Sequence, residues 1–260
     1  MRIRVINPNT TASMTTLIEV SARAVAGPGV VVEAVTPAMG PASIESHYDE
    51  ALAVPGLLAE IIAGERDGAD GHVIACFGDP GLDAAREIAS GPVVGIAEAA
   101  MHAATLVGRG FSVVTTLGRT AGRAHDLARR YTATGACKGV HACEIPVLEL
   151  ETDPTVLPRV VALARHALDH DGSDVIVLGC AGMAGLCADV SRRVGVPVID
   201  GVTAATLLVQ SLVTLGLGTS KRDEYAPPLV KAYSGRLSDF MQPGRDGSRQ
   251  GGVRAKEGLV

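Results

Sequence analysis

The sequence predicts an α/β protein with two pseudo-symmetric lobes, each a four-stranded parallel sheet flanked by helices, and an active site in the cleft between them. Short β-branched runs alternate with amphipathic stretches along the chain, a pattern typical of parallel sheets covered by helices. Several of these runs, such as those at 73–75 and 175–178, are apolar at every position, as strands buried on both faces are. An internal repeat, described below, indicates that the pattern occurs twice.

The first half of the chain predicts four strands and four helices. Its first strand, Arg2–Ile6, stops at the turn Asn7-Pro-Asn, where Asn and Thr side chains are suited to cap the helix that follows. The other runs predict strands at 30–35, 72–76 and 93–96, and helices at 11–25, 50–64, 81–90 and 97–107.

The second half predicts the same order of elements. Its strands are expected at 112–115, 144–148, 174–178 and 196–199, and its helices at 119–131, 155–169, 184–194 and 202–215. Three pairs of segments align when the chain is compared with itself: Pro92-Val-Val-Gly with Pro197-Val-Ile-Asp, Asp70–Gly78 with Ser173–Gly182, and Arg4-Val-Ile-Asn with Ser112-Val-Val-Thr. Their offsets agree to within a few residues, at about 105.

This repeat sets the expected domain boundaries. We expect a first lobe at residues 1–105, completed by the helical segment 202–235, and a second lobe at 106–201. Residues 241–260 contain too few apolar side chains to pack, so the sequence predicts a mobile C-terminal tail there.

The composition excludes several classes of protein. Of the 260 residues 47% are hydrophobic and 20% charged, which is incompatible with a disordered chain. Aromatic residues make up only 3%, Trp is absent and the net charge is −5, so a nucleic-acid partner is not expected. We expect a small-molecule substrate instead, and association of copies through the Ala-rich apolar helices into a homo-oligomer.

The termini and cysteines indicate a compartment. The first residues lack the pattern of a signal peptide, and no run approaches the roughly 18–20 apolar residues that a membrane helix needs. The five cysteines are an odd number, and none has zinc-site spacing, so no metal site is expected. Reduced thiols in a cytoplasmic protein without a membrane partner are the simplest interpretation.

Two of the cysteines occupy equivalent places in the two halves. Cys76 and Cys180 each end a predicted buried strand and enter a Gly-containing turn before a helix. Ligands of open α/β sheets gather at this edge, and the N–H groups of a following helix lower the pKa of a thiol there. We therefore expect the two thiols to face each other across the cleft with lowered pKa values.

Two opposed thiols suit the inversion of a carbon acid. One thiolate removes the proton from one face, and the other thiol delivers a proton to the opposite face. The alternative for any single cysteine is a small apolar core residue, and Cys137, Cys143 and Cys187 are assigned that structural role. The duplicated position of the other two favours catalysis.

Five motifs follow one another along roughly residues 1–235: Asn7-Pro-Asn-Thr-Thr, Ile44-Glu-Ser-His-Tyr-Asp-Glu, Cys76-Phe-Gly-Asp-Pro-Gly, Thr115-Thr116 and Gly179-Cys-Ala-Gly-Met. In this order they resemble the Asp/Glu/hydantoin racemase superfamily, and within it the hydantoin and allantoin racemase branch. The resemblance implies no cofactor and 1,1-proton transfer with Cys76 and Cys180 as the acid–base pair. The segment Gly78-Asp-Pro stands where hydantoin racemases more often carry Asp-Asp-Thr, which favours allantoin as the substrate.

The supporting residues each have a structural and a ligand-binding interpretation. Asn9, Thr115 and Thr116 either cap or bind an imide ring, and the resemblance adds Ile44 as pocket wall. Asp79 either caps the following helix or touches a substrate N–H. The remaining predicted contacts are backbone N–H groups that would support an oxyanion, at Phe77, Gly78, Ala181 and Gly182.

Two other functions remain open at this stage. A racemase of free aspartate or glutamate would need cationic contacts, and no Arg is conveniently placed at either strand end. A two-lobed binding protein without catalysis would have no need of a thiol at each of the two strand ends. The preferred function is a cofactor-independent racemase of a hydantoin ring, either allantoin or a 5-substituted amino-acid hydantoin.

Overall fold

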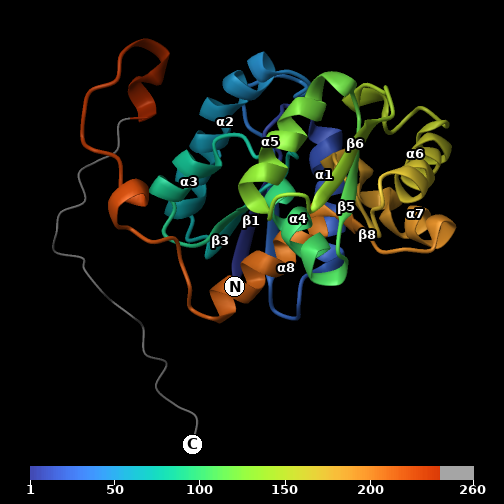
Figure 1. The fold of residues 1–260 in the computed structure, drawn as a ribbon. Helices are drawn as coiled ribbons and strands as arrows, with labels where there is room; N and C mark the ends of the chain where they lie inside the picture. Colours follow the sequence, from blue (N-terminus) through green and yellow to red (C-terminus); the bar gives the residue numbers. More distant parts are fainter. Residues whose placement is uncertain (241–260) are drawn as a thin grey trace, which may run out of the picture.

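The structure of the protein is a computed structural model that describes residues 1–240. The tail predicted at 241–260 lies outside the described residues. Two four-stranded sheets, every strand pair of which is parallel, lie side by side with helices around them (Figure 1). The α/β fold class with two parallel sheets is therefore confirmed.

The first sheet has the strand order β2-β1-β3-β4. Its strands are β1 (Arg2–Ile6), β2 (Val31–Val35), β3 (Gly71–Ile74) and β4 (Val93–Gly95). The helices that alternate with them are α1 (Ala12–Val25), α2 (His47–Arg66), α3 (Leu82–Ile88) and α4 (Ile96–Val107).

The second sheet has the order β6-β5-β7-β8, which matches the first sheet strand for strand. Its strands are β5 (Phe111–Thr115), β6 (Cys137–Ala142), β7 (Val175–Leu178) and β8 (Val198–Asp200). The helices are α5 (Ala121–Tyr131), α6 (Val156–His170), α7 (Cys187–Val194) and α8 (Gly201–Thr214), with short 3₁₀ turns η1 (Gly118–Thr120), η2 (Val147–Glu149) and η3 (Ala181–Leu186).

One predicted strand was wrong. Residues 144–148 form no strand; they contain Pro146, which has no N–H for a ladder, and they lead into η2. The strand is β6 at Cys137–Ala142, which pairs only with β5 at the sheet edge. Every β6 residue is at least partly exposed, so β6 lacks the continuous apolar run that marks strands such as β7. The segment predicted as helical to 235 also differs: α8 ends at Thr214, and only the 3₁₀ turns η4 (Asp223–Tyr225) and η5 (Gly235–Phe240) follow in the described residues.

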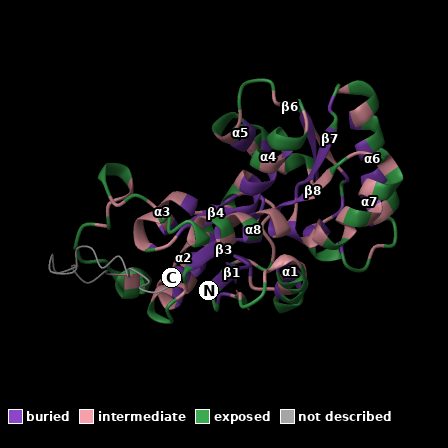
Figure 2. Ribbon diagram, turned by 90° about the horizontal axis from the view of Figure 1, so that it is seen from below, coloured by how far each residue is buried: buried purple, intermediate pink, exposed green. Residues whose placement is uncertain are grey.

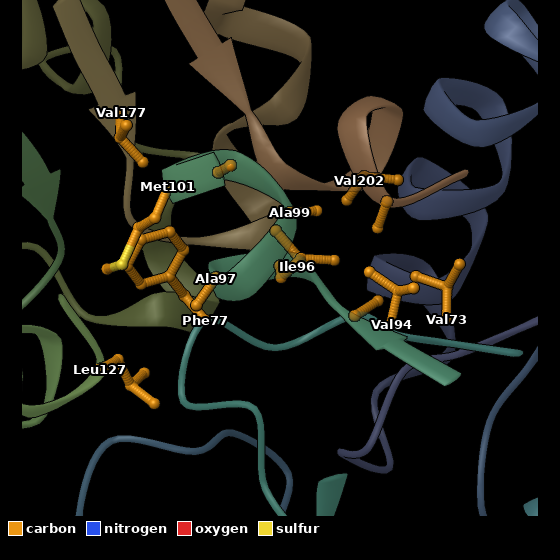
Figure 3. Packing of buried hydrophobic residues seen from close by; sticks show 14 of the residues in the cluster. Val73, Phe77, Val94, Ile96, Ala97, Ala99, Met101, Leu127, Val177 and Val202 are labelled. Atoms are coloured by element: carbon orange, nitrogen blue, oxygen red, sulfur yellow. The ribbon is translucent and has the colours of Figure 1, made fainter. Parts of the chain in front are cut away.

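Helices α4 and α8 cross between the sheets. Helix α4 follows the first sheet but packs on β5, β7 and β8 of the second, whereas α8 follows the second sheet and packs on α1, β1, β3 and β4 of the first. In the interior, Met101 of α4 lies toward Phe77 and Val177, and Ile96 lies toward Val94 and Val202 (Figure 3). One buried cluster therefore runs through both lobes, and the strands form its centre (Figure 2). Of the described helices, none combines the length and apolar character that crossing a bilayer requires.

Candidate active site between the two sheets

A pocket opens where the carboxyl ends of strands from both sheets meet. It encloses about 780 Å³ including its open mouth. Its wall comes from the turns after β1, β3, β5 and β7, from the start of α2, and from η1, α5 and η2. Ligand sites of parallel α/β sheets are expected at this edge. Both lobes contribute, as the sequence predicted for the cleft.

Most of the predicted site residues line this pocket together. Cys76 and Cys180 are both in its wall, each partly buried. The predicted contacts that join them are Asn9, Ile44, Phe77, Gly78, Thr115, Thr116 and Ala181. Asp79 and Gly182 each follow a lining residue in the chain but do not line the pocket themselves. The Phe77 ring also belongs to the buried core, where it lies beside Met101 (Figure 3).

Cys76 has a charged neighbourhood. It follows β3 in a turn, and the N–H of Gly78 donates a hydrogen bond to its sulfur. A Cβ on Gly78 would lie 3.8 Å from the Cys76 Sγ and 3.1 Å from Glu50 Oε1, so the thiol and this carboxylate flank the same glycine. Burial raises the pKa of Cys76 to about 12; the Gly78 N–H opposes this, while Cys180, Glu50 and Asp79 add to it.

Cys180 has the same backbone frame with more apolar neighbours. The N–H of Gly182 donates to its sulfur. A Cβ on Gly182 would lie 3.8 Å from the Cys180 Sγ, 3.0 Å from Leu150 Cδ1 and 3.8 Å from Met14 Cε. Burial raises the pKa of Cys180 to about 11; the Gly182 N–H opposes this, while Cys143 and Glu45 add to it. The prediction that both thiols have lowered pKa values is therefore wrong, because desolvation outweighs the N–H groups at each strand end.

The N–H groups of Gly78 and Gly182 have a different partner from the one predicted. Both were expected to support a substrate oxyanion, but both face the sulfur of a cysteine two residues earlier. They are therefore placed to stabilise thiolates.

Asp79 caps a helix, but a different one from the helix expected. Its carboxylate accepts N–H bonds from Ala97 at 3.1 Å and Glu98 at 2.9 Å, in the first turn of α4 rather than of the following helix α3. Asp79 is 3% exposed. Its burial and its bonds to α4 therefore favour the capping interpretation over a contact with a substrate N–H.

The polar residues after β1 and β5 are held by neighbours. Asn9 Oδ1 accepts bonds from Asn7 Nδ2 and from the Thr11 N–H, both at 2.9 Å, and Asn9 Nδ2 donates to Met14 Sδ at 3.4 Å. This network orients the Asn9 amide in the pocket wall. Thr115 Oγ1 donates to the Gly179 carbonyl at 3.1 Å, which leaves its lone pairs for a ligand.

Two arginines that the sequence reasoning missed line the pocket. Arg123 of α5 donates to the Gly78 carbonyl through Nε at 3.2 Å and Nη2 at 2.7 Å, and its Nη2 lies 2.9 Å from Glu50 Oε1. Arg119 lies one turn earlier. The expectation that no Arg lies near the strand ends is wrong, because both follow β5 in η1 and α5 rather than ending a strand.

A second contact between the lobes lies on the Cys180 side. Glu45 Oε1, from the segment before α2, accepts the N–H of Val147 in η2 at 2.6 Å. The sequence signal for these residues is the polar run 43–50 and the helix start at 119–123, both beside predicted strand ends. Their partners are 45 to 102 residues away in sequence, so no local pattern identifies them. Within residues 1–240, no group of three or more His, Cys, Asp or Glu side chains is arranged to hold a metal ion.

Comparison with known proteins gives a consistent result. The model of the Asp/Glu/Hydantoin racemase family matches residues 3–209. A hydantoin racemase of Rhizobium meliloti is 49% identical over 236 residues, which cover 90% of this chain and 98% of the relative. An allantoin racemase structure from Klebsiella pneumoniae shares 52% identity with a TM-score of 0.90, over 93% of this chain and 99% of that one. The allantoin racemase structure from Pseudomonas fluorescens shares 42% identity with a TM-score of 0.87, over 90% and 100%.

Proposed function

The chain belongs to the Asp/Glu/hydantoin racemase family, and from this premise we propose that it is an isomerase that racemises a hydantoin ring at C5 by proton transfer between Cys76 and Cys180. The observation that carries the proposal is that both thiols, in equivalent turns after β3 and β7, line one pocket. The similarity of the whole chain to hydantoin and allantoin racemases supports the same reaction.

The proposed reaction removes a proton from one face of C5 and adds a proton to the opposite face. The thiolate of one cysteine takes the C5 proton, and the electron pair of the C–H bond delocalises onto the adjacent ring carbonyl. The thiol of the other cysteine then gives its proton to the opposite face of C5. The enzyme finishes with the two protonation states exchanged, so the reverse reaction uses the same pair with exchanged roles.

The pocket supplies groups for both the thiolate and the ring. The Gly78 and Gly182 N–H groups would stabilise whichever sulfur carries the charge. For the ring, the Asn9 amide and the N–H groups of Phe77 and Ala181 are in the wall beside the two thiols. We assign these three groups to the carbonyl oxygen on which negative charge develops.

The substrate class has two members to distinguish. Allantoin carries a ureido group at C5, whereas amino-acid hydantoins carry an alkyl or aromatic group there. The relatives include racemases named for each, so the experiment must compare both. A racemase of free aspartate or glutamate is a second candidate, because Arg119 and Arg123 place positive charge at the pocket. Arg123 is already bonded to Gly78 and Glu50, which favours the neutral ring.

The test is proton exchange followed in D₂O. Enantiopure allantoin, 5-isobutylhydantoin and glutamate are each incubated with the purified protein, reductant and chelator, with a blank that corrects for spontaneous racemisation. For at least one hydantoin we expect the rotation to decay and deuterium to enter C5. For glutamate we expect neither loss of rotation nor deuterium at the α-carbon. Unchanged rotation with both hydantoins would reject the proposal. Exchange of glutamate alone would replace it by the second candidate.

The assembly and the location of the protein stay predictions. We propose a homo-oligomer in the cytoplasm. Exposed apolar side chains such as Val20 on α1 and Leu106 on α4 support self-association. Light scattering after size exclusion would give the number of subunits, and a monomer at micromolar concentration would contradict the proposal.

A further inference from the structure

We infer that Asp79 is a positioning residue, which ties the turn that carries Cys76 to the N-terminus of α4 and thereby fixes the Cys76 thiol in the pocket. This inference rests on the catalytic role proposed for Cys76. It concerns a buried residue that does not line the pocket.

Asp79 makes hydrogen bonds through both its backbone and its side chain. Through the backbone, the Asp79 N–H donates to the Cys76 carbonyl at 3.0 Å, which closes the turn. Through the side chain, the two carboxylate oxygens take the N–H groups of Ala97 and Glu98. Asp79 has φ 46°, a left-handed conformation that is uncommon outside glycine. The backbone thus adopts an unfavourable conformation in which the carboxylate reaches α4.

The second lobe shows how such a helix is capped without this device. Helix α8 is the counterpart of α4, and it is capped locally by Asp200, whose Oδ1 accepts the N–H groups of Val202 at 2.9 Å and Thr203 at 3.0 Å. These two residues are the counterparts of Ala97 and Glu98 in the alignment of the two halves. The same two helical N–H groups therefore receive a carboxylate in both lobes, but from different places in the chain.

The counterpart of Asp200 in the first lobe is Gly95, and its surroundings explain the exchange. Gly95 has φ −84° and ψ 150°, close to the −94° and 143° of Asp200, so its backbone would suit a capping Asp. A Cβ on Gly95, however, would lie 2.2 Å from the Asp79 Cγ. The Asp79 carboxylate thus occupies the space that a local cap would need. A local cap would satisfy α4 equally well, but it would leave the Cys76 turn unattached.

Charged groups near the Cys76 turn act on the same attachment. The pKa of Cys76 is raised by burial, by the Cys180 thiol and by the Glu50 carboxylate of α2. The pKa of Asp79 is raised by burial and by the Glu98 carboxylate of α4, and lowered by the Tyr131 hydroxyl of α5. Arg123 holds the Gly78 carbonyl in the same turn. The turn is therefore attached to α4 by Asp79 and to α5 by Arg123.

The experiment exchanges the two residues. The variant D79G removes the attachment and the cap, and glycine accepts the positive φ. The double variant D79G/G95D restores a cap from the strand end, as in the second lobe, but leaves the turn unattached. The variant D200G is the matched control, since it removes the other cap without touching a cysteine turn. For each variant, the melting temperature, kcat and KM for the racemised hydantoin, and the alkylation rates of Cys76 and Cys180 by iodoacetamide are measured.

We expect D79G and D200G each to lower Tm by about 3–6 °C, since each leaves two helical N–H groups without a carboxylate. D79G is expected to lower kcat about 100-fold with KM changed less than threefold, because a misplaced catalytic group affects the reaction step most. D79G/G95D is expected to regain most of the lost Tm while kcat stays low and the Cys76 alkylation rate stays altered. D200G is expected to keep kcat within about threefold.

Recovery of kcat together with Tm in D79G/G95D would overturn the inference, because Asp79 would then act only as a cap. Unchanged kcat and Cys76 alkylation in D79G would overturn it as well. If D79G does not fold, the double variant carries the test, since its cap is intact. The alkylation rates need no substrate, so they judge the position of Cys76 even if the racemase proposal itself fails.

Discussion

The two halves of the pocket share a backbone frame and differ in what surrounds it. In both, a cysteine stands two residues beyond a buried parallel strand, and the glycine two residues later directs its N–H at the thiol. Beside the first glycine stands the Glu50 carboxylate, and beside the second stands Leu150. The comparison shows that strand, turn and glycine suffice to place the sulfur, whereas its electrostatic environment is set by other segments.

The connections of the two turns to the rest of the molecule differ too. The Cys76 turn is bonded to α4 by Asp79 and to the opposite lobe by Arg123. On the Cys180 side, Glu45 bonds to Val147 in η2, and the neighbour that the cysteine turn has from the other lobe is the apolar Met14 of α1. We therefore expect Cys76 to depend more on polar contacts with the other lobe than Cys180 does.

The largest expected effect comes from removing either thiol. C76A and C180A should each lower racemisation by about 10³-fold, since inversion needs an acid on one face and a base on the other. Each variant keeps one thiol, which can still remove a proton and return a deuteron on its own face. In D₂O, C76A should therefore exchange C5–H of one enantiomer without inversion, and C180A should do so with the other.

Proton NMR of each enantiopure hydantoin, read beside the optical rotation, distinguishes exchange from inversion. C137A is the matched control, because Cys137 on β6 is a partly buried thiol of the second lobe that does not line the pocket. If both single variants exchanged the same enantiomer, the two thiols would not face opposite sides of the ring.

Loss of Arg123 should affect the two thiols unequally. R123Q removes the arginine that pairs with the Glu50 carboxylate beside Cys76, together with two hydrogen bonds to the Gly78 carbonyl. Both changes should raise the pKa of the Cys76 thiol further, so we expect alkylation of Cys76 to slow about tenfold relative to Cys180. Mass spectrometry of the two peptides gives this ratio.

R129Q serves as the control for Arg123, because Arg129 lies on the same helix and pairs only with exposed Asp126 among the described residues. An unchanged ratio of Cys76 to Cys180 alkylation in R123Q would contradict the dependence of Cys76 on the opposite lobe.

The fold followed from the sequence wherever a strand is buried on both faces. Strands such as β3 and β7 are continuous apolar runs, and the repeat doubled their signal. Strand β6 was missed because an edge strand keeps partly exposed residues and needs no such run. The exchange of α4 and α8 between the sheets also has no local signal, because either helix could cover either sheet.

The site could be predicted where it depends on backbone position and not where it depends on long-range contacts. Cys76 and Cys180 were found because strand ends define the ligand edge. The pKa direction was wrong, since burial of a thiol cannot be read from its neighbours in sequence. Asp79 was expected to cap α3, the next helix in the chain. Its partner is α4, which comes after α3 and strand β4.

The two capping carboxylates should respond to pH in the same direction and to different extents. Burial raises the pKa of Asp79 to about 7, and it also raises the pKa of Asp200. A raised carboxyl pKa means that the folded state resists ionisation, so stability present below pH 3.8 is lost as pH rises toward 7. Subtracting the unfolding free energy of D79G from that of the wild type should give a difference that falls by up to about 1.4 kcal/mol per pH unit.

The same subtraction with D200G should give a shallower slope. Asp200 accepts two N–H groups and the Thr203 hydroxyl, all of which stabilise its charge, whereas Asp79 also faces the Glu98 carboxylate. Urea titrations at pH 5, 6 and 7 measure both slopes. If the difference for Asp79 rises with pH instead, the N–H groups that it accepts outweigh its burial and favour the ionised carboxylate.

The smallest expected effect is the difference between the two thiols in the unaltered protein. The pKa is about 11 for Cys180 and about 12 for Cys76, so at pH 8.5 the thiolate fraction of Cys180 is about tenfold larger. A less basic thiolate is also less nucleophilic, which cancels roughly half of this advantage on a logarithmic scale. Cys180 should therefore be alkylated about threefold faster than Cys76. Because Glu50 contributes to the higher pKa of Cys76, E50Q should bring the two rates closer. Faster alkylation of Cys76 in the wild type would show that the charged neighbours of that thiol favour its ionised form, and the contrast between the two half-sites would then be reversed.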